Sequence, residues 1–156
     1  MSAKMNNSNE MSPFQEIMMA MKKSYRTFLE DCEALTKNQA YKEGICGTWS
    51  AKALVDHLTG WQILSPSFLK ECLSSDNPVL DVDIDTINRI SVEERQAWSW
   101  EESLAAFKES FDIFEHVLDE IPMIQIQTNA GIKSWVKAMN HEYQFHRDHI
   151  QKALER

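Results

Sequence analysis

The sequence predicts an all-α protein, a four-helix bundle with a long crossover segment that carries a short helix. Apolar residues recur at helical spacing along most of the chain, and only four glycines and four prolines interrupt them. The length of 156 residues suits one domain with a buried core. We expect a disordered N-terminal arm over residues 1–11 and a single domain over residues 12–156.

The four long helices are defined by start signals and apolar seams. Ser12 is the expected N-cap of the first, with Pro13 following it and Gln15 completing a capping box. Ser50 is the expected cap of the second, and "SWEE", from Ser99, is another capping box. The expected helices span about 12–35, 50–72, 99–121 and 130–154.

The segment between the second and third helices, "SSDNPVLDVDIDTINRISVEERQAW", is too long for a tight turn. It predicts a short helix over about 85–96, with Asn88 as a candidate cap and Arg89 in solvent, and a long crossover suits a four-helix bundle. The segment "MIQIQ", residues 123–127, alternates like a strand but lacks a partner, so we expect an extended linker.

Composition excludes several classes of function. The net charge of −8 argues against a nucleic-acid surface, and no apolar run approaches the roughly 20 residues of a membrane span. The N-terminus lacks the apolar stretch of a secretion signal. Three cysteines without a CxxC pair suit reduced thiols, so we expect a cytoplasmic protein.

Titratable residues interrupt two apolar seams. In "VDHLTGW", His57 falls where a core residue is expected, and in "NHEYQFHRDHI" the seam passes through Glu142 and His146, with His149 on the same arc. His116 and His141 point away from their seams. Burying such groups unpaired costs several kcal/mol, so we expect them to pair, to hold water or to coordinate an ion.

Two interpretations of these residues remain open. Imidazole and carboxylate side chains form mixed shells around divalent metals, and three protein ligands leave an open position. Alternatively, Glu142 and His146 form an i, i+4 ion pair at the mouth of the bundle, with His149 at the rim. Trp49 and Trp61 either line a pocket or pack in the core, and Tyr143 either contacts a substrate or packs.

These residues resemble the DinB-like superfamily, including its ClbS/DfsB and maleylpyruvate-isomerase-type relatives. The stretch "GTWSAKALVDHLTGW" is similar to the family's helix-two signature, and "EYQFHRDHI" is similar to its last-helix pattern. The segment "DTINRISVEERQAWSWEESLAAF" also resembles the family, so the likeness runs from about Phe14 to Leu154.

The resemblance implies a divalent ion, commonly Zn or Ni, held by one histidine of helix two and two of the last helix. His57 and His146 match two of these ligands, whereas Glu142 takes the middle position and His149 replaces a glutamine. Either Glu142 or His149 could complete the ligand set. Alternatively, the site could work without metal, as the resemblance to ClbS-like members implies. In that case Glu142 would act as general base, tuned by His146.

We therefore expect an enzyme acting on a small molecule, a hydrolase or thiol transferase with a role in stress or detoxification. A protective small-molecule-binding protein without metal, or a dimer with a degenerate site, is the alternative. The resemblance also implies a homodimer in a bacterial cytoplasm.

Overall fold

The computed structural model describes residues 10–75, 78 and 80–156, and this part of the chain is all-helical. Apart from one isolated bridge between Cys46 and Trp49, it contains no β structure. The predicted N-terminal arm, except Glu10 and Met11, lies outside the described residues. The helices are α1 (Pro13–Glu33), α2 (Lys37–Tyr41), α3 (Ala51–Ser74), α4 (Ile84–Glu93), α5 (Trp100–Glu120), α6 (Met123–Gln127) and α7 (Ala130–Leu154).

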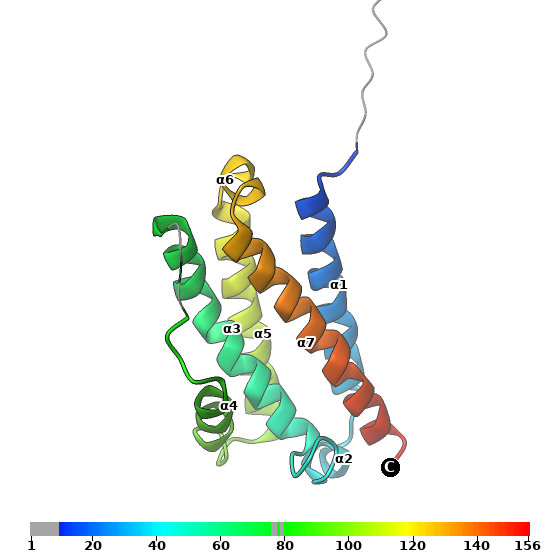
Figure 1. Cartoon of the computed structure of the whole chain (residues 1–156). Coiled ribbons are helices and arrows are strands. Elements are labelled where there is room, and N and C mark those ends of the chain that lie inside the picture. The colour runs from blue at the N-terminus through cyan, green and yellow to red at the C-terminus, as the bar shows by residue number, and fades with distance from the viewer. Residues whose placement is uncertain (1–9, 76–77, 79) are drawn as a thin grey trace, which may run out of the picture.

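The four long helices lie alongside one another (Figure 1). The most extensive packing joins α1 to α7 and α3 to α5, and α3 also contacts α7. The shorter helices sit at the periphery: α2 lies near the start of α3, α4 packs on α3, and α6 precedes α7. No helix in the described residues is long and apolar enough to cross a bilayer.

The predicted caps of the long helices are confirmed. Ser12 and Ser99 form capping boxes with Gln15 and Glu102, and the Ser50 side chain accepts a hydrogen bond from the Ala53 backbone N–H. Each side-chain oxygen satisfies a backbone N–H that the helix itself leaves without a partner. The expected long helices therefore begin where the sequence predicts.

Two local predictions were wrong. Residues Met123–Gln127 form the short helix α6 rather than an extended linker, because a five-residue segment is too short for its period to be diagnostic. Asn88 does not cap α4; Asp83 does, by accepting a hydrogen bond from the Thr86 backbone N–H. Arg89 is exposed as predicted and pairs with Glu93.

The core is built from the predicted seams and contains a cluster of aromatic rings. Tyr25 of α1 stacks on Phe111 of α5, with ring centroids 3.5 Å apart. Phe28, Phe107 and Tyr143 complete the cluster and are fully buried. This cluster joins three long helices and fixes the rotation of α7, so it determines which face α7 turns toward α3.

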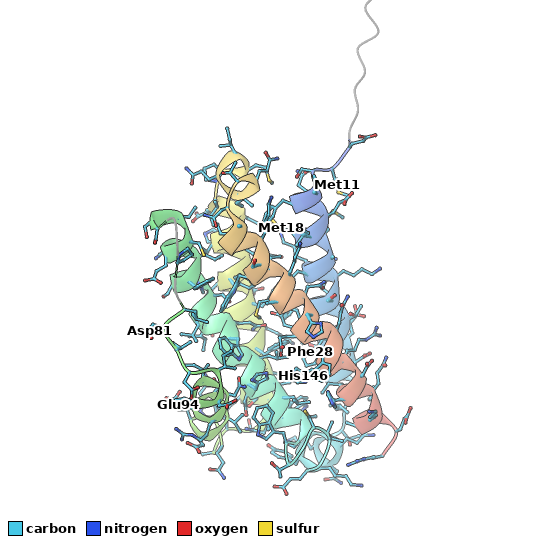
Figure 2. The ribbon with its side chains drawn as sticks, viewed as in Figure 1. Met11, Met18, Phe28, Asp81, Glu94 and His146 are labelled. Carbon is cyan, nitrogen blue, oxygen red and sulfur yellow. The ribbon has the colours of Figure 1, made fainter. Side chains whose placement is uncertain are left out.

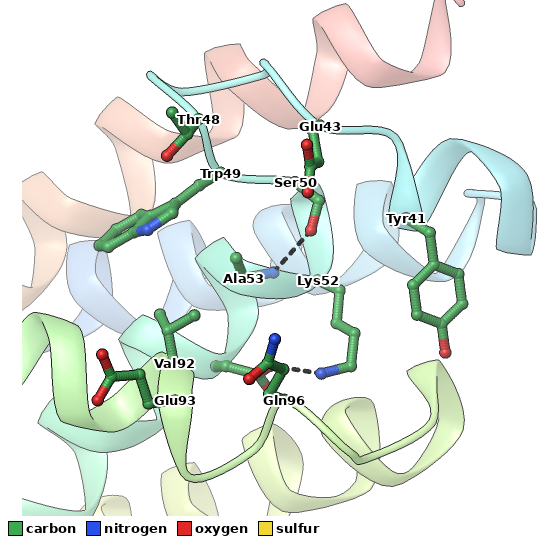
Figure 3. A pocket seen from close by; sticks show the side chains of 11 residues that line it. Tyr41, Glu43, Thr48, Trp49, Ser50, Lys52, Ala53, Val92, Glu93 and Gln96 are labelled. Carbon is green, nitrogen blue, oxygen red and sulfur yellow. Dashed lines mark hydrogen bonds and ion pairs between the residues drawn. The ribbon is translucent and has the colours of Figure 1, made fainter.

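A buried ion pair joins the start of α3 to the segment that follows α4. Lys52 Nζ donates to Asp56 Oδ2 at 2.7 Å and to the Arg95 carbonyl oxygen at 2.8 Å, and Ser103 Oγ donates to Asp56 Oδ1 at 2.6 Å. Lys52 and Asp56 line a cavity of about 500 Å³ at this end of α3, and Figure 3 shows Lys52 among the side chains of its wall. The Lys52 and Asp56 side chains are both nearly inaccessible to solvent. Each charge therefore needs the opposite charge of the other to offset the cost of its burial.

Helices α3 and α4 approach closely at Gly60. A Cβ atom at this position would lie 1.8 Å from Ser91 Oγ and 2.5 Å from Ser91 Cβ. We expect Gly60→Ala to force α4 away from α3 and to lower the free energy of unfolding by about 1–3 kcal/mol. Denaturant melts of Gly60→Ala and of the double variant Gly60→Ala with Ser91→Gly measure this loss of stability. In the double variant, Ser91→Gly removes the two atoms that the new Cβ would meet. Equal losses in the two variants would contradict the contact.

Candidate metal centre

Three titratable side chains from two distant parts of the sequence meet between α3 and α7. His57 Nε2 lies 3.5 Å from Glu142 Oε2, and His146 Nε2 lies 3.2 Å from the same oxygen. One ligand atom from each residue lies within 4.8 Å of the other two. The imidazole centroids are 5.3 Å apart and their planes are nearly perpendicular. The two histidines and the carboxylate thus form one cluster.

The cluster follows from helical geometry on both sides. Glu142 and His146 are one turn apart on α7, so their side chains project from the same face, and Figure 2 shows His146 where α7 faces α3. His57 occupies the second turn of α3 and is 4 % exposed, while His146 is 5 % exposed. Glu142 is more accessible than either histidine and lies at the solvent side of the cluster.

The electrostatics of the cluster keep Glu142 ionised. Contacts with His146 first, and then with His57, hold the pKa of Glu142 well below its usual range, although partial burial opposes the shift. Both imidazoles use Nε2 to face this carboxylate. The Nδ1 atom of His57 is buried and has no hydrogen-bond partner among the described residues.

The lowered pKa of Glu142 predicts a pH dependence of stability. Because the folded state favours the ionised carboxylate, its stabilisation is present above the usual pKa of 4.5 and is lost as the pH falls through the native value. We expect the difference in free energy of unfolding between wild type and Glu142→Gln to shrink as the pH falls below 4.5. Denaturant melts over a pH series measure it; a difference that grows toward acid would contradict the assignment.

A cavity of about 400 Å³ opens beside the cluster. His57, Glu142 and His146 form part of its wall, and tryptophan side chains form much of the rest. The indole N–H of Trp61 donates to Asn88 Oδ1, and that of Trp135 donates to Ser65 Oγ, both at 2.8 Å. Because these donors are already satisfied, Trp61 and Trp135 offer the cavity mainly apolar surface. The full lining is Trp49, His57, Trp61, Leu80, Ile84, Asn88, Trp135, Ala138, Met139, Glu142, Phe145 and His146.

The structure brings some of the predicted site residues together and separates others. Trp61 lines the cavity, the first of the two positions that the sequence left open for it. Tyr143 does not, because it lies in the aromatic core, where its hydroxyl donates to Gln62 Oε1 at 2.7 Å. His149 is outside the His57 cluster and approaches the opposite side of His146, with the two Nδ1 atoms 3.4 Å apart. His116 and His141 are exposed, as predicted.

Sequence reasoning missed three residues at this site. Cys46 forms a second group of candidate metal ligands with His146 and His149, and these three ligand atoms also lie within 4.8 Å of one another. Trp135 and Phe145 line the cavity from α7. Trp135 continues the apolar spacing of α7, so its position in the sequence is that of a core residue. Cys46 lies about 100 residues before His146 and His149, and no sequence pattern places it beside them.

Comparisons of the chain with protein-family models, with curated proteins and with solved structures find no match.

Proposed function

We propose that the chain is a DinB-like four-helix bundle that binds one divalent ion at His57, Glu142 and His146. In this proposal it acts as a hydrolase or transferase on a small, mainly apolar molecule. The observation that carries it is the convergence of two imidazoles and one carboxylate, from helices about 90 residues apart in sequence, at the wall of a cavity. Four long helices and a crossover with a short helix support the bundle assignment.

The donor set fits a divalent ion. Two ligand atoms about 2.1 Å from a tetrahedral ion lie about 3.4 Å apart, and the separations here are 3.2 and 3.5 Å. Two histidines with one carboxylate suit Zn, Ni, Fe and Mn.

The residues around the cluster suggest how a substrate is held. A bound divalent ion would polarise a substrate oxygen and lower the pKa of a water at its open position. Trp49, Trp61 and Trp135 would hold an apolar body by contact with their rings. Glu142, on the solvent side, would direct the polar end of the substrate toward the histidines.

The alternative is a metal-free protein that binds or sequesters a reactive small molecule, as the resemblance to ClbS-like proteins suggests. It is favoured by the contacts of Glu142 with both imidazoles, which let the cluster persist without an ion. The version in which Glu142 acts as general base is weaker, because a carboxylate with a strongly lowered pKa is a poor base near neutral pH.

The cellular setting and the partners belong to the same proposal. A homodimer and a bacterial cytoplasmic location are supported by the resemblance alone. A small-molecule partner is supported by the size and apolar lining of the cavity. The net charge of −8 supports a partner other than a nucleic acid.

Metal content tests the proposal directly. Untagged protein that has been chelated and then reloaded with Ni²⁺ or Zn²⁺ is expected to retain one ion per chain. Free ion at about 100 times Kd adds about 2.7 kcal/mol to the free energy of unfolding, which raises the melting temperature by about 5–10 °C for a domain of this size. The His57→Ala, Glu142→Ala double variant should lose the Ni²⁺-dependent rise. No retained ion and an unchanged melting temperature would favour the metal-free alternative.

A further inference from the structure

His146 belongs to two groups of candidate metal ligands, and its two ring nitrogens face different neighbours. Its Nε2 faces Glu142 and His57, whereas its Nδ1 faces His149 at 3.4 Å. Cys46 completes the second group, with one ligand atom from each of the three residues within 4.8 Å of the others. The two groups therefore lie on opposite sides of one buried imidazole.

The backbone before α3 presents Cys46 to this side of α7. Cys46 and Trp49 form an isolated antiparallel bridge, closed by two backbone hydrogen bonds between them. Gly47 takes a φ of 57°, a conformation that side chains disfavour, and this allows the turn. The turn is tied directly to the capped start of α3, so the thiol is held by the same helix that positions His57.

The chemistry of the second group suits a soft divalent ion. The 3.4 Å between the two Nδ1 atoms equals the separation of about 3.4 Å expected for two nitrogen ligands of a tetrahedral ion. A neutral imidazole offers the lone pair of one ring nitrogen to a metal, so His149 can supply a ligand beside His146. One thiolate with two imidazoles leaves a fourth position open and favours Zn²⁺ or Cd²⁺ over harder ions.

We propose that Cys46, His146 and His149 form a second metal position, and that this position and the His57 cluster exclude one another. A neutral imidazole has one lone pair and one N–H, so His146 can ligate through Nε2 or through Nδ1 but not through both. The exclusion rests on the proposed function above, whereas the second position does not.

The remaining contacts of His146 complete either arrangement. When Nδ1 is the ligand, the Nε2–H group donates to Glu142, the carboxylate partner that metal-bound histidines commonly have. When Nε2 is the ligand, the Nδ1–H group donates to His149. A cysteine binds a metal as the thiolate, so the ion must displace the Cys46 thiol proton on binding.

Thiolate-to-metal charge-transfer absorption tests the second position. The full chain, chelated and reduced, is titrated with Co²⁺ and with Cd²⁺ while the ultraviolet absorption and the bound ion are measured. We expect a charge-transfer band in wild type and in His57→Ala, and loss of the band in Cys46→Ser and in His149→Ala. Cys72→Ala, a change of a buried cysteine near the far end of α3, is the control and should keep the band.

The outcomes separate this inference from the proposed function. No band in His57→Ala, or a band that survives Cys46→Ser, would overturn the second position, even where wild type shows stoichiometric binding that depends on His57 and Glu142. Binding that depends on Cys46 but not on His57 would support the second position and contradict the proposed function. Two ions bound per chain at saturation would overturn the exclusion.

Discussion

His146→Ala is expected to abolish metal binding of every kind, because His146 is the one residue common to both ligand groups. Removing a residue that only hydrogen-bonds to a metal ligand and orients it already lowers metal affinity by about 10–100-fold. We therefore expect loss of this ligand to weaken binding by more than about 100-fold, for Ni²⁺ and for Zn²⁺ alike. Calorimetric titration of the chelated protein measures the affinity, and far-ultraviolet circular dichroism checks that the variant is folded.

The matched control for His146→Ala lies on the same helix. His141 is exposed and belongs to neither ligand group, so His141→Ala should bind both ions with wild-type affinity. A His146→Ala variant that is folded and binds either ion within about tenfold of wild type would contradict the shared role. Equal losses in the two variants would point to nonspecific binding at surface histidines.

Asp56→Ala is expected to be the most destabilising single change at the ion pair of α3. Removing the carboxylate leaves the Lys52 ammonium 5 % exposed and without its counter-ion, and it also removes the acceptor for Ser103. Breaking a buried pair in this way costs about 3–5 kcal/mol. Chemical denaturation of the variant and the wild type, compared at one pH, measures the loss.

Two controls separate burial from charge in this prediction. Glu101 pairs with Lys37 at 2.9 Å on the surface, so Glu101→Ala should cost less than about 1 kcal/mol. Replacing both buried partners, in Lys52→Met with Asp56→Leu, leaves no isolated charge and should be less damaging than Asp56→Ala alone. If Asp56→Ala and Glu101→Ala destabilise equally, the pair is not buried in the folded protein.

The helices could be predicted from sequence because their signals are local. The cap at Ser12 and the capping box at Ser99 involve residues three positions apart, and apolar seams repeat over several turns. The five-residue helices α2 and α6 carry too few repeats to be predicted, and α2 was not expected. An all-α protein was thus predictable, whereas its short connections were not.

The site was predictable only in part, for a physical reason. Helical spacing places Glu142 and His146 on one face and identifies His57 as an interruption in an apolar seam. Tyr143 lies one position from Glu142, which turns its side chain about 100° around α7 and into the core. Cys46 joins the site through a turn before α3, and no periodicity in the sequence connects that turn to α7.

The proposed function requires one ion to be shared by His57, Glu142 and His146. A crystal of the chelated chain reloaded with Ni²⁺, measured at the nickel absorption edge, locates the ion by its anomalous signal. We expect a single peak about 2.1 Å from Nε2 of both histidines and from a carboxylate oxygen of Glu142. Loaded crystals with no peak between these three side chains would contradict it.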